Sequence, residues 1–268
     1  MDSNGTDLLA IAREIAIEAG ALAVRRRAEG VGVVASKSSL EDVVTAADRE
    51  VEELILGRLS DLRPADGFLG EESGGRSGQS GLTWVVDPID GTVNYLYGIP
   101  HYAVSIAVVE GDPDPSTWSA LAGVVLNPAS GELYQAAAGA GAFLGNRRLE
   151  LPPAPALDQA LIATGFAYSS ARRLEQGAVV AQLLGRVRDI RRMGSAALDL
   201  TAVAAGRVNA YFEGQLAPWD LAAGSLIAAE AGARVSGITE LRPGPSGIVV
   251  GPAALAVRLQ QALIEMGY

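Results

Sequence analysis

The stretch Trp84-Val85-Val86-Asp87-Pro88-Ile89-Asp90-Gly91-Thr92 decides both the fold and the chemistry expected of this chain. The apolar residues 83–86 at its start predict a buried strand. Asp87 is expected to end that strand, because the proline after it has no N–H with which to continue the pairing. Asp87 and Asp90 can then point into one cavity, and the turn directs the Ile89 carbonyl toward them. Such an oxygen-rich group suits Mg2+.

The end of the same stretch favours a phosphate in that cavity. Gly91 and Thr92 predict the start of a helix, whose free N–H groups bind phosphate oxygens. Two carboxylates, a carbonyl and a helix start are the parts of a magnesium-dependent phosphatase site. The alternative is that Asp87 forms a turn and Asp90 caps the helix, and the spacing alone does not separate these two interpretations.

Other acids lie where hydrophobic patterning does not predict them. Glu71 and Glu72 open a glycine-rich segment, where they are either site residues or solvated loop residues. Asp220 lies in the first turn of a predicted apolar helix, where an acid also complements the helix dipole. Thr45 and Asp48 have the spacing of a capping box, with Asp in the usual place of Glu. Asp48 can also align a hydroxyl or a water in the site.

Composition narrows the function classes. The chain has 268 residues, 49% of them hydrophobic, which is enough for a sizeable core. Its net charge of -10 makes it a poor ligand for nucleic acid or an anionic membrane and a better host for cations. With no cysteine and one histidine, His101, any metal must be held mainly by oxygen, which favours Mg2+, Mn2+ or Ca2+. No targeting or transmembrane segment is visible, so we expect a cytoplasmic protein.

Periodicity predicts alternating helices and strands and hence layered sheets. The glycine-rich residues 70–81 are expected to form a loop, and the proline-rich residues 152–155 mark a boundary. We therefore expect an N-terminal αβ sub-domain over 1–152, with most of the metal ligands, and a C-terminal αβ sub-domain over 153–268, with Asp220 and the substrate pocket. Helices are expected over 7–27, from 44 to 63, and over 174–184, 195–205, 218–231 and 253–266, and strands over 83–86, 102–109, 120–126, 132–137, 161–164, 210–213 and 247–250.

Four motifs in order make the chain resemble the inositol monophosphatase family. Residues 84–95 resemble its first signature and residues 218–224 its second, while residues 44–48 and 70–73 match in order and approximate spacing. The resemblance covers nearly the whole chain. It implies a layered αβαβα fold, of the type shared with fructose-1,6-bisphosphatase, and a metal-dependent phosphomonoesterase that is commonly dimeric and often lithium-sensitive.

The resemblance also implies a role for each motif residue. It implies two or three Mg2+ ions, with Mn2+ as an alternative ion, and a weaker third ion near Glu71. Thr92, hydrogen-bonded to Asp48, is expected to orient the attacking water. The implied catalytic residues are Glu71, Thr92 and Asp48; the implied metal ligands are Glu71, Asp87, the Ile89 carbonyl, Asp90 and Asp220; and the implied substrate contacts are Gly91, Thr92, Ser195, Ala196 and Glu213.

The substrate stays open at this point. Residues 92–95 resemble the inositol and sugar-phosphate branches of the family. Glu213 favours a polyol, since a carboxylate can accept hydrogen bonds from neighbouring hydroxyls, and inositol 1-phosphate is the first choice. The alternatives are fructose 1,6-bisphosphate, histidinol phosphate, a 3'-phosphoadenosine nucleotide, or a non-catalytic regulatory protein that retains the fold. The segment 37–42 is one residue longer than the family's usual stretch, so Lys37 receives no role.

Overall fold

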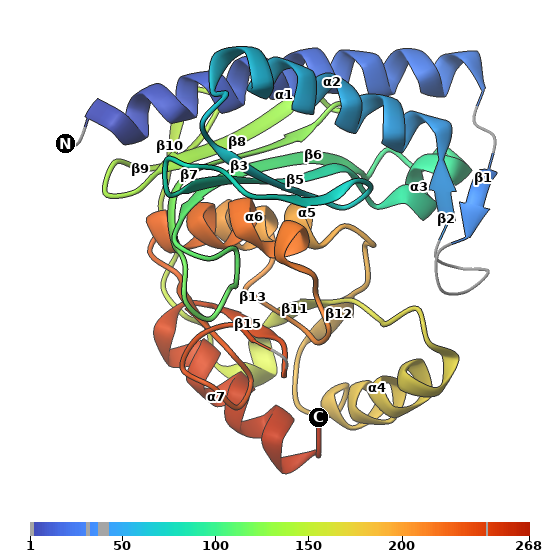
Figure 1. Cartoon of the computed structure of the whole chain (residues 1–268). Coiled ribbons are helices and arrows are strands. Elements are labelled where there is room, and N and C mark those ends of the chain that lie inside the picture. The colour runs from blue at the N-terminus through green and yellow to red at the C-terminus, as the bar shows by residue number, and fades with distance from the viewer. Residues whose placement is uncertain (1–2, 31–32, 37–42, 245) are drawn as a thin grey trace.

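The computed structural model describes residues 3–30, 33–36, 43–244 and 246–268, which form five layers (Figure 1). Two helices lie outermost, followed by a large sheet, a pair of buried helices, a small sheet and a second outer pair of helices. The expected αβαβα arrangement is therefore confirmed. The segment 37–42, with Lys37, lies outside the described residues.

The large sheet has eight strands in the order β10-β9-β8-β7-β6-β5-β3-β4. Its neighbouring strands pair antiparallel except β3 and β5, which run parallel. Strands β1 and β2 pair antiparallel and precede the second helix, and the six-residue helix α3 follows β5. The bounds are β1 (Val33–Ser36), β2 (Val43–Thr45), β3 (Gly67–Gly70), β4 (Gly74–Arg76), β5 (Leu82–Asp90), α3 (Thr92–Tyr97), β6 (Ala103–Glu110), β7 (Ser119–Asn127), β8 (Glu132–Ala137), β9 (Gly141–Leu144) and β10 (Arg147–Leu149).

Helices α1 (Ser3–Glu29) and α2 (Ala46–Leu62) cover the outer face of this sheet. In α1, Leu8, Ile15 and Leu22 recur at helical spacing and are buried against the strands. Helix α2 begins at a capping box, because Thr45 and Asp48 each accept a hydrogen bond from the other's backbone N–H. The hydrophobic pattern thus sets which face of each helix meets the sheet.

Helices α5 (Ala196–Ala204) and α6 (Pro218–Glu230) form the middle layer between the two sheets. All residues of α5 are buried, as expected for a helix covered on both sides. The two helices approach closely at Gly224, where an added Cβ would lie 2.7 Å from the Cβ of Leu200. The glycine of the second signature is therefore needed for packing.

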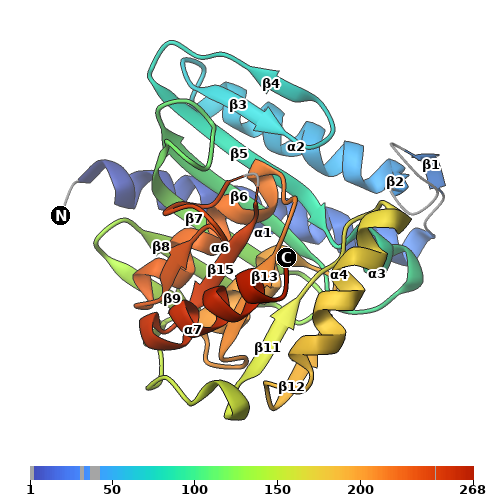
Figure 2. The same ribbon diagram turned by 90° about the horizontal axis from the view of Figure 1, so that it is seen from below.

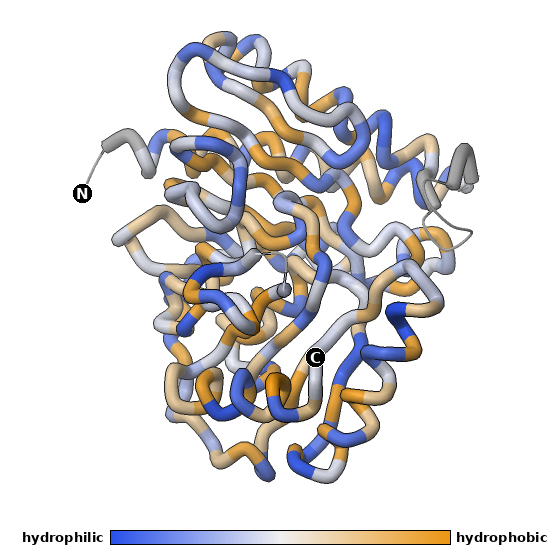
Figure 3. The backbone as a smooth tube through the Cα atoms, turned by 60° about the horizontal axis from the view of Figure 1, so that its bottom comes forward, coloured by the Kyte–Doolittle hydropathy of each residue, from blue (hydrophilic) through white to orange (hydrophobic). Residues whose placement is uncertain are grey.

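The small sheet has five strands in the order β12-β11-β13-β15-β14, and α4 and α7 cover its outer face (Figure 2). In Figure 3 hydrophilic and hydrophobic residues alternate along these outer helices, as expected for elements with one buried face. No described helix is long and apolar enough to cross a membrane. The bounds are β11 (Leu161–Thr164), α4 (Ser170–Leu183), β12 (Asp189–Arg191), β13 (Ala210–Glu213), β14 (Arg234–Ser236), β15 (Ile248–Gly251) and α7 (Ala253–Glu265), with a 3-10 turn over Leu157–Gln159.

Most expected elements are present within a few residues of their predicted bounds. The main differences are β5, which was expected over 83–86 and spans Leu82–Asp90, and short strands such as β3, β9 and β14, which were not expected. The expected strands 132–137, 161–164 and 210–213 have the predicted bounds. The prediction of a loop over 70–81 is wrong in part, because residues 74–76 form a strand that pairs with β3. This pairing uses backbone hydrogen bonds, which a segment rich in glycine and serine can still form. The division into 1–152 and 153–268 stays a prediction.

Adding a methyl group at Gly224 should destabilise the fold. The Gly224→Ala variant forces α5 and α6 apart, and we expect a loss of about 1–3 kcal/mol in the free energy of unfolding. Urea unfolding measures this loss. The control is Gly57→Ala, at an exposed α2 position with open space around it, which should stabilise the protein by about 0.5–1 kcal/mol. Equal stability of both variants would contradict the packing assigned to Gly224.

Candidate active site

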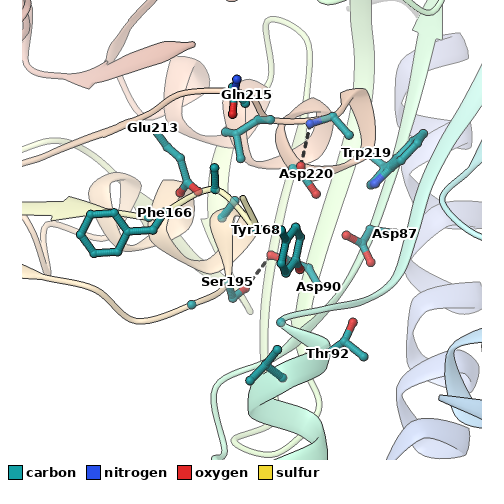
Figure 4. Close-up of a pocket in the computed structure, with 18 of the residues that line it drawn as sticks. Asp87, Asp90, Thr92, Phe166, Tyr168, Ser195, Glu213, Gln215, Trp219 and Asp220 are labelled. Atoms are coloured by element: carbon teal, nitrogen blue, oxygen red, sulfur yellow. Dashed lines mark hydrogen bonds between the residues drawn. The ribbon is translucent and has the colours of Figure 1, made fainter. Parts of the chain in front are cut away.

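A cavity of about 620 Å3 opens where several elements from the two sheets and the middle layer end. Its walls come from the turn after β3, the junction of β5 and α3, the end of β13, and the starts of α5 and α6. Figure 4 shows the side chains that converge there. The cavity therefore brings together residues that are more than 100 positions apart in the sequence.

Three carboxylates form the most compact acidic group of the cavity. Asp87 and Asp90 on β5 and Asp220 in the first turn of α6 each offer one oxygen, and these oxygens lie within 4.8 Å of one another. Asp87 and Asp90 are buried, and Asp220 is partly exposed to the cavity. Figure 4 shows the three side chains on the same side of the site. Carboxylates at this spacing can share a divalent cation.

A bulge in β5 puts the first two acids on the same side. Asp87 pairs with Ser105 and Asp90 pairs with Ala103, so three steps on β5 oppose two steps on β6. Residues three apart on a regular strand point to opposite faces of the sheet. The extra residue in the bulge brings the Asp87 and Asp90 side chains to the same face. The prediction that Asp87 ends the strand is wrong, because β5 continues to Asp90. Pro88 is accommodated in the bulge, where the ladder is already interrupted.

Backbone donors hold each of these carboxylates in place. Asp90 Oδ2 accepts hydrogen bonds from Ser195 Oγ at 2.6 Å and from Ala197 N at 2.7 Å, both at the start of α5. Asp220 Oδ2 accepts one from Ala217 N at 2.7 Å, and Asp87 Oδ1 accepts one from the Ile89 backbone.

Asp90 and Asp220 therefore each accept a hydrogen bond at the start of a helix and also belong to the acidic group. The idea that Asp90 caps the following helix is wrong. The N-cap residue of α3 is Gly91, no side chain caps that helix, and Asp90 accepts from the start of α5 instead. Asp220, in the first turn of α6, both accepts from the residue before that helix and belongs to the group of three.

Burial makes this group electrostatically costly without a cation. It raises the pKa of Asp90 to about 6, even though the Ser195 and Ala197 donors act in the opposite direction. Burial, together with the charges of Glu71 and Asp90, raises the pKa values of Asp87 and Asp220 well above the ordinary range. Clustered buried carboxylates are expensive unless they are protonated or bind a cation. This donor set, all oxygen and rich in charge, fits Mg2+ or Mn2+.

Glu71 lines the same cavity but does not belong to the compact group. It follows β3, and its backbone N–H donates to the carbonyl of Val86 on β5 at 3.3 Å. Its charge has the largest effect, after burial, on the pKa of Asp87. Glu71 therefore lines the same cavity as the three aspartates but lies outside their compact group.

Asp48 lies behind the cavity and contacts Thr92. The Thr92 hydroxyl is 3.2 Å from Asp48 Oδ1 and also 3.2 Å from the Ile89 carbonyl. The Thr45 backbone and hydroxyl both donate to Asp48 Oδ2. Burial raises the pKa of Asp48 to about 6 against these hydrogen bonds. Asp48 therefore completes the capping box of α2 and also contacts the Thr92 hydroxyl, and its role in the chemistry stays a prediction.

The opposite wall carries the remaining predicted residues. Glu213 ends β13 and accepts a hydrogen bond from Tyr211 Oη at 2.6 Å, and burial raises its pKa to about 7. Gly165 is needed beside it, because a Cβ there would overlap the Glu213 carboxylate. Gly91, Ser195 and Ala196 also line the cavity. All predicted site residues except Asp48 thus line the cavity.

Several residues of the site were missed from the sequence. Arg173 and Arg192 bring positive charge to the cavity, and Tyr168 places a half-exposed ring at its wall. No motif marks these three. A buried acid outside the cavity, Glu52, was also missed. It lies four residues after Asp48 on α2, and that helical spacing is a signal that was available.

Comparison with known proteins agrees with this geometry. A model of the inositol monophosphatase family matches residues 5–265. An inositol-1-monophosphatase of Mycobacterium leprae is 46% identical over 96% of this chain and 90% of its own length. A protein of Xylella fastidiosa named Nus factor SuhB is 39% identical over 87% of this chain and 85% of its own length.

Solved structures show the same relationship. The extragenic suppressor protein suhB of Bartonella henselae superposes with a TM-score of 0.86 at 35% identity, covering 96% of this chain and 98% of that one. Sequence, fold and the order of the acidic motifs therefore agree, and the chain belongs to the inositol monophosphatase family, a family of phosphoric monoester hydrolases.

Proposed function

We propose that this chain is a Mg2+-dependent phosphomonoesterase that hydrolyses a small polyol phosphate, with inositol 1-phosphate as its substrate. The observation that carries the proposal is the facing arrangement in one cavity of three clustered carboxylates and Glu213. The first group suits cations that hold a phosphate, and the second suits the hydroxyls of the group attached to it.

The residues that would hold the cations are Glu71, Asp87, the Ile89 carbonyl, Asp90 and Asp220. Support comes from the raised pKa values of the three aspartates, because a bound divalent cation would offset their repulsion. When bound, Mg2+ would act as a Lewis acid, which lowers the pKa of a nearby water and stabilises the negative charge that develops on the phosphate. Two or three ions, lithium sensitivity, a homodimer and a cytoplasmic location stay predictions from the family resemblance.

Thr92 would orient the water that attacks the phosphorus. A hydroxyl has one proton, so a Thr92 hydroxyl that donates to Asp48 Oδ1 leaves its lone pairs for a water. The Asp48 carboxylate is itself fixed by Thr45, which limits the directions that Thr92 can adopt. The Glu71 carboxylate, beside Asp87, would act as the general base that accepts the proton leaving this water.

The substrate would lie between two helix starts. Gly91 has a left-handed φ of 92°, and a Cβ there would lie 3.0 Å from the Gly194 carbonyl, so only glycine fits. Its N–H and that of Thr92 would bind phosphate oxygens, and Ser195 and Ala196 at the start of α5 would contact the substrate in the same pocket. Glu213 would accept hydrogen bonds from the polyol hydroxyls across the cavity.

Phosphate release from a small substrate panel tests the proposal. The panel is inositol 1-phosphate, fructose 1,6-bisphosphate, histidinol phosphate and 3'-phosphoadenosine 5'-phosphate, each with Mg2+ and with EDTA. We expect Mg2+-dependent release that is fastest from inositol 1-phosphate. Faster release from another panel member would identify that compound as the better substrate and contradict the choice of inositol 1-phosphate. No release and no Mg2+ binding would contradict an enzymatic role and favour a regulatory one, as the name of the Xylella relative suggests for that protein.

The Asp90→Asn variant should lose at least about 100-fold in kcat/KM while it keeps its fold. The asparagine oxygen can still accept from Ser195 and Ala197, so only the charge toward the cation is removed. Circular dichroism checks the fold and phosphate release measures the rate. Asp112→Asn, at an exposed loop position, is the charge-matched control. A wild-type rate for Asp90→Asn would show that Asp90 is not a ligand.

The raised pKa of Glu213 should make the free energy of unfolding of the metal-free protein decrease as pH rises. Its folded pKa of about 7 lies above the ordinary 4.5, so the folded state keeps a proton that the unfolded state has lost. Between pH 4.5 and 7 the wild type therefore loses stability relative to Glu213→Gln. We expect a change on the order of 2 kcal/mol, since each pKa unit equals about 1.4 kcal/mol and the side chain still meets cavity water. Urea unfolding across this range measures it, and a pH-independent difference would contradict the raised pKa.

A further inference from the structure

Glu52 is a buried acid outside the cavity, and the proposed chemistry does not use it. Its side chain is only 2% exposed, and it lies on α2 one turn after Asp48. Residues four apart share one face of a helix. Helix α2 therefore presents two carboxylates to its inner side, of which Asp48 contacts Thr92 and Glu52 contacts the turn after β3.

Both oxygens of Glu52 bind backbone in that turn. Oε2 accepts a hydrogen bond from the backbone N–H of Glu72 at 2.9 Å, and Oε1 accepts one from Ser73 at 2.7 Å. The preceding N–H, that of Glu71, donates to the carbonyl of Val86 on β5. Three consecutive backbone donors are thus satisfied, two by a single buried carboxylate, and the turn is held from two sides.

The carboxylate of Glu52 also packs directly on the backbone of the turn. A Cβ at Gly70 would lie 2.5 Å from Glu52 Oε2 and 2.6 Å from its Cδ. A side chain at position 70 would therefore displace the carboxylate. The glycine before Glu71 and the acid on α2 are two parts of one contact.

We propose that Glu52 is a positioning residue for the cation site. It holds the turn at residues 71–73 so that the Glu71 carboxylate faces Asp87. The inference rests on the proposed function, because it takes Glu71 as a cation ligand. Glu71 and Asp87 line the same cavity, and the Glu71 N–H is hydrogen-bonded to the carbonyl of Val86, the residue before Asp87. A rigid helix then sets the distance between this turn and Thr92 through Glu52 and Asp48.

The test measures Mn2+ binding to the full chain by electron paramagnetic resonance, without substrate. In Glu52→Gln the amide NH2 faces a backbone N–H, so one of the two hydrogen bonds is lost. We expect Mn2+ to bind about 10–100-fold more weakly. The Mg2+ concentration for half-maximal phosphate release should rise in parallel, while kcat at saturating Mg2+ stays near the wild-type value.

Two controls separate positioning from general stability. Glu53→Gln removes the same charge from the exposed side of α2 and should leave Mn2+ affinity unchanged. Val51→Ala, at a fully buried position of the same helix, should lower stability and also leave the affinity unchanged. Weaker Mn2+ binding in Val51→Ala, equal to that in Glu52→Gln, would overturn the proposal in favour of a purely structural role.

A double-mutant cycle tests whether Glu52 acts through Glu71. If it does, Glu52→Gln combined with Glu71→Gln should bind Mn2+ no more weakly than Glu71→Gln alone. Fully additive losses would overturn the proposal. Wild-type protein that binds no Mn2+ would contradict the proposed function itself, whereas normal wild-type binding with unchanged affinity in Glu52→Gln would contradict this inference alone.

Gly70→Ala perturbs the same contact from the other side and keeps the proposal testable if Glu52→Gln does not fold. Its methyl group would push the Glu52 carboxylate away from the turn. We expect a loss of Mn2+ affinity similar to that of Glu52→Gln. Unchanged affinity in a folded Gly70→Ala protein would overturn the proposal.

Discussion

Mutual repulsion among the carboxylates of Asp87, Asp90 and Asp220 is the constraint to which the surrounding structure responds. Their nearest oxygens lie within 4.8 Å of one another. Backbone N–H groups of Ile89, Ala197 and Ala217 each donate to one of the three. These donors hold the acids in place but do not remove their charge, which leaves the group suited to a divalent cation.

The middle layer of the fold supplies the positive ends that face this group. Helices α5 and α6 lie between the two sheets, and both begin at the cavity. Helix starts favour negative charge, because their first N–H groups have no partners within the helix. The close packing at Gly224 and Leu200 fixes these two starts relative to each other. The buried layer thus serves the site as well as the core.

The outer helix α2 positions the other side of the site. Asp48 aligns Thr92, and Glu52 holds the turn that carries Glu71. A helix is a suitable spacer for this purpose, since residues four apart are held at a fixed separation along one face. Neither acid lines the cavity: Asp48 is hydrogen-bonded to Thr92, which does, and Glu52 is hydrogen-bonded to the two residues that follow Glu71.

Most of the fold and most of the site could be predicted from the sequence, for different reasons. Long amphipathic helices and apolar strands have clear periodicity, whereas three-residue strands such as β10 and β12 do not. The site acids were found because they interrupt hydrophobic patterns. The bulge in β5 was missed because pairing register is a tertiary property, and Arg192 was missed because an exposed arginine in a loop has no local signal.

The most direct test of the account is a crystal structure of the protein grown with Mn2+, with anomalous scattering recorded to locate the ion. The account predicts an anomalous peak bounded by oxygens of Asp87, Asp90 and Asp220, with ligand distances near 2.2 Å as is typical for hard divalent ions and oxygen. The absence of a peak between these three carboxylates at millimolar Mn2+ would contradict the claim that the fold is organised around a cation site.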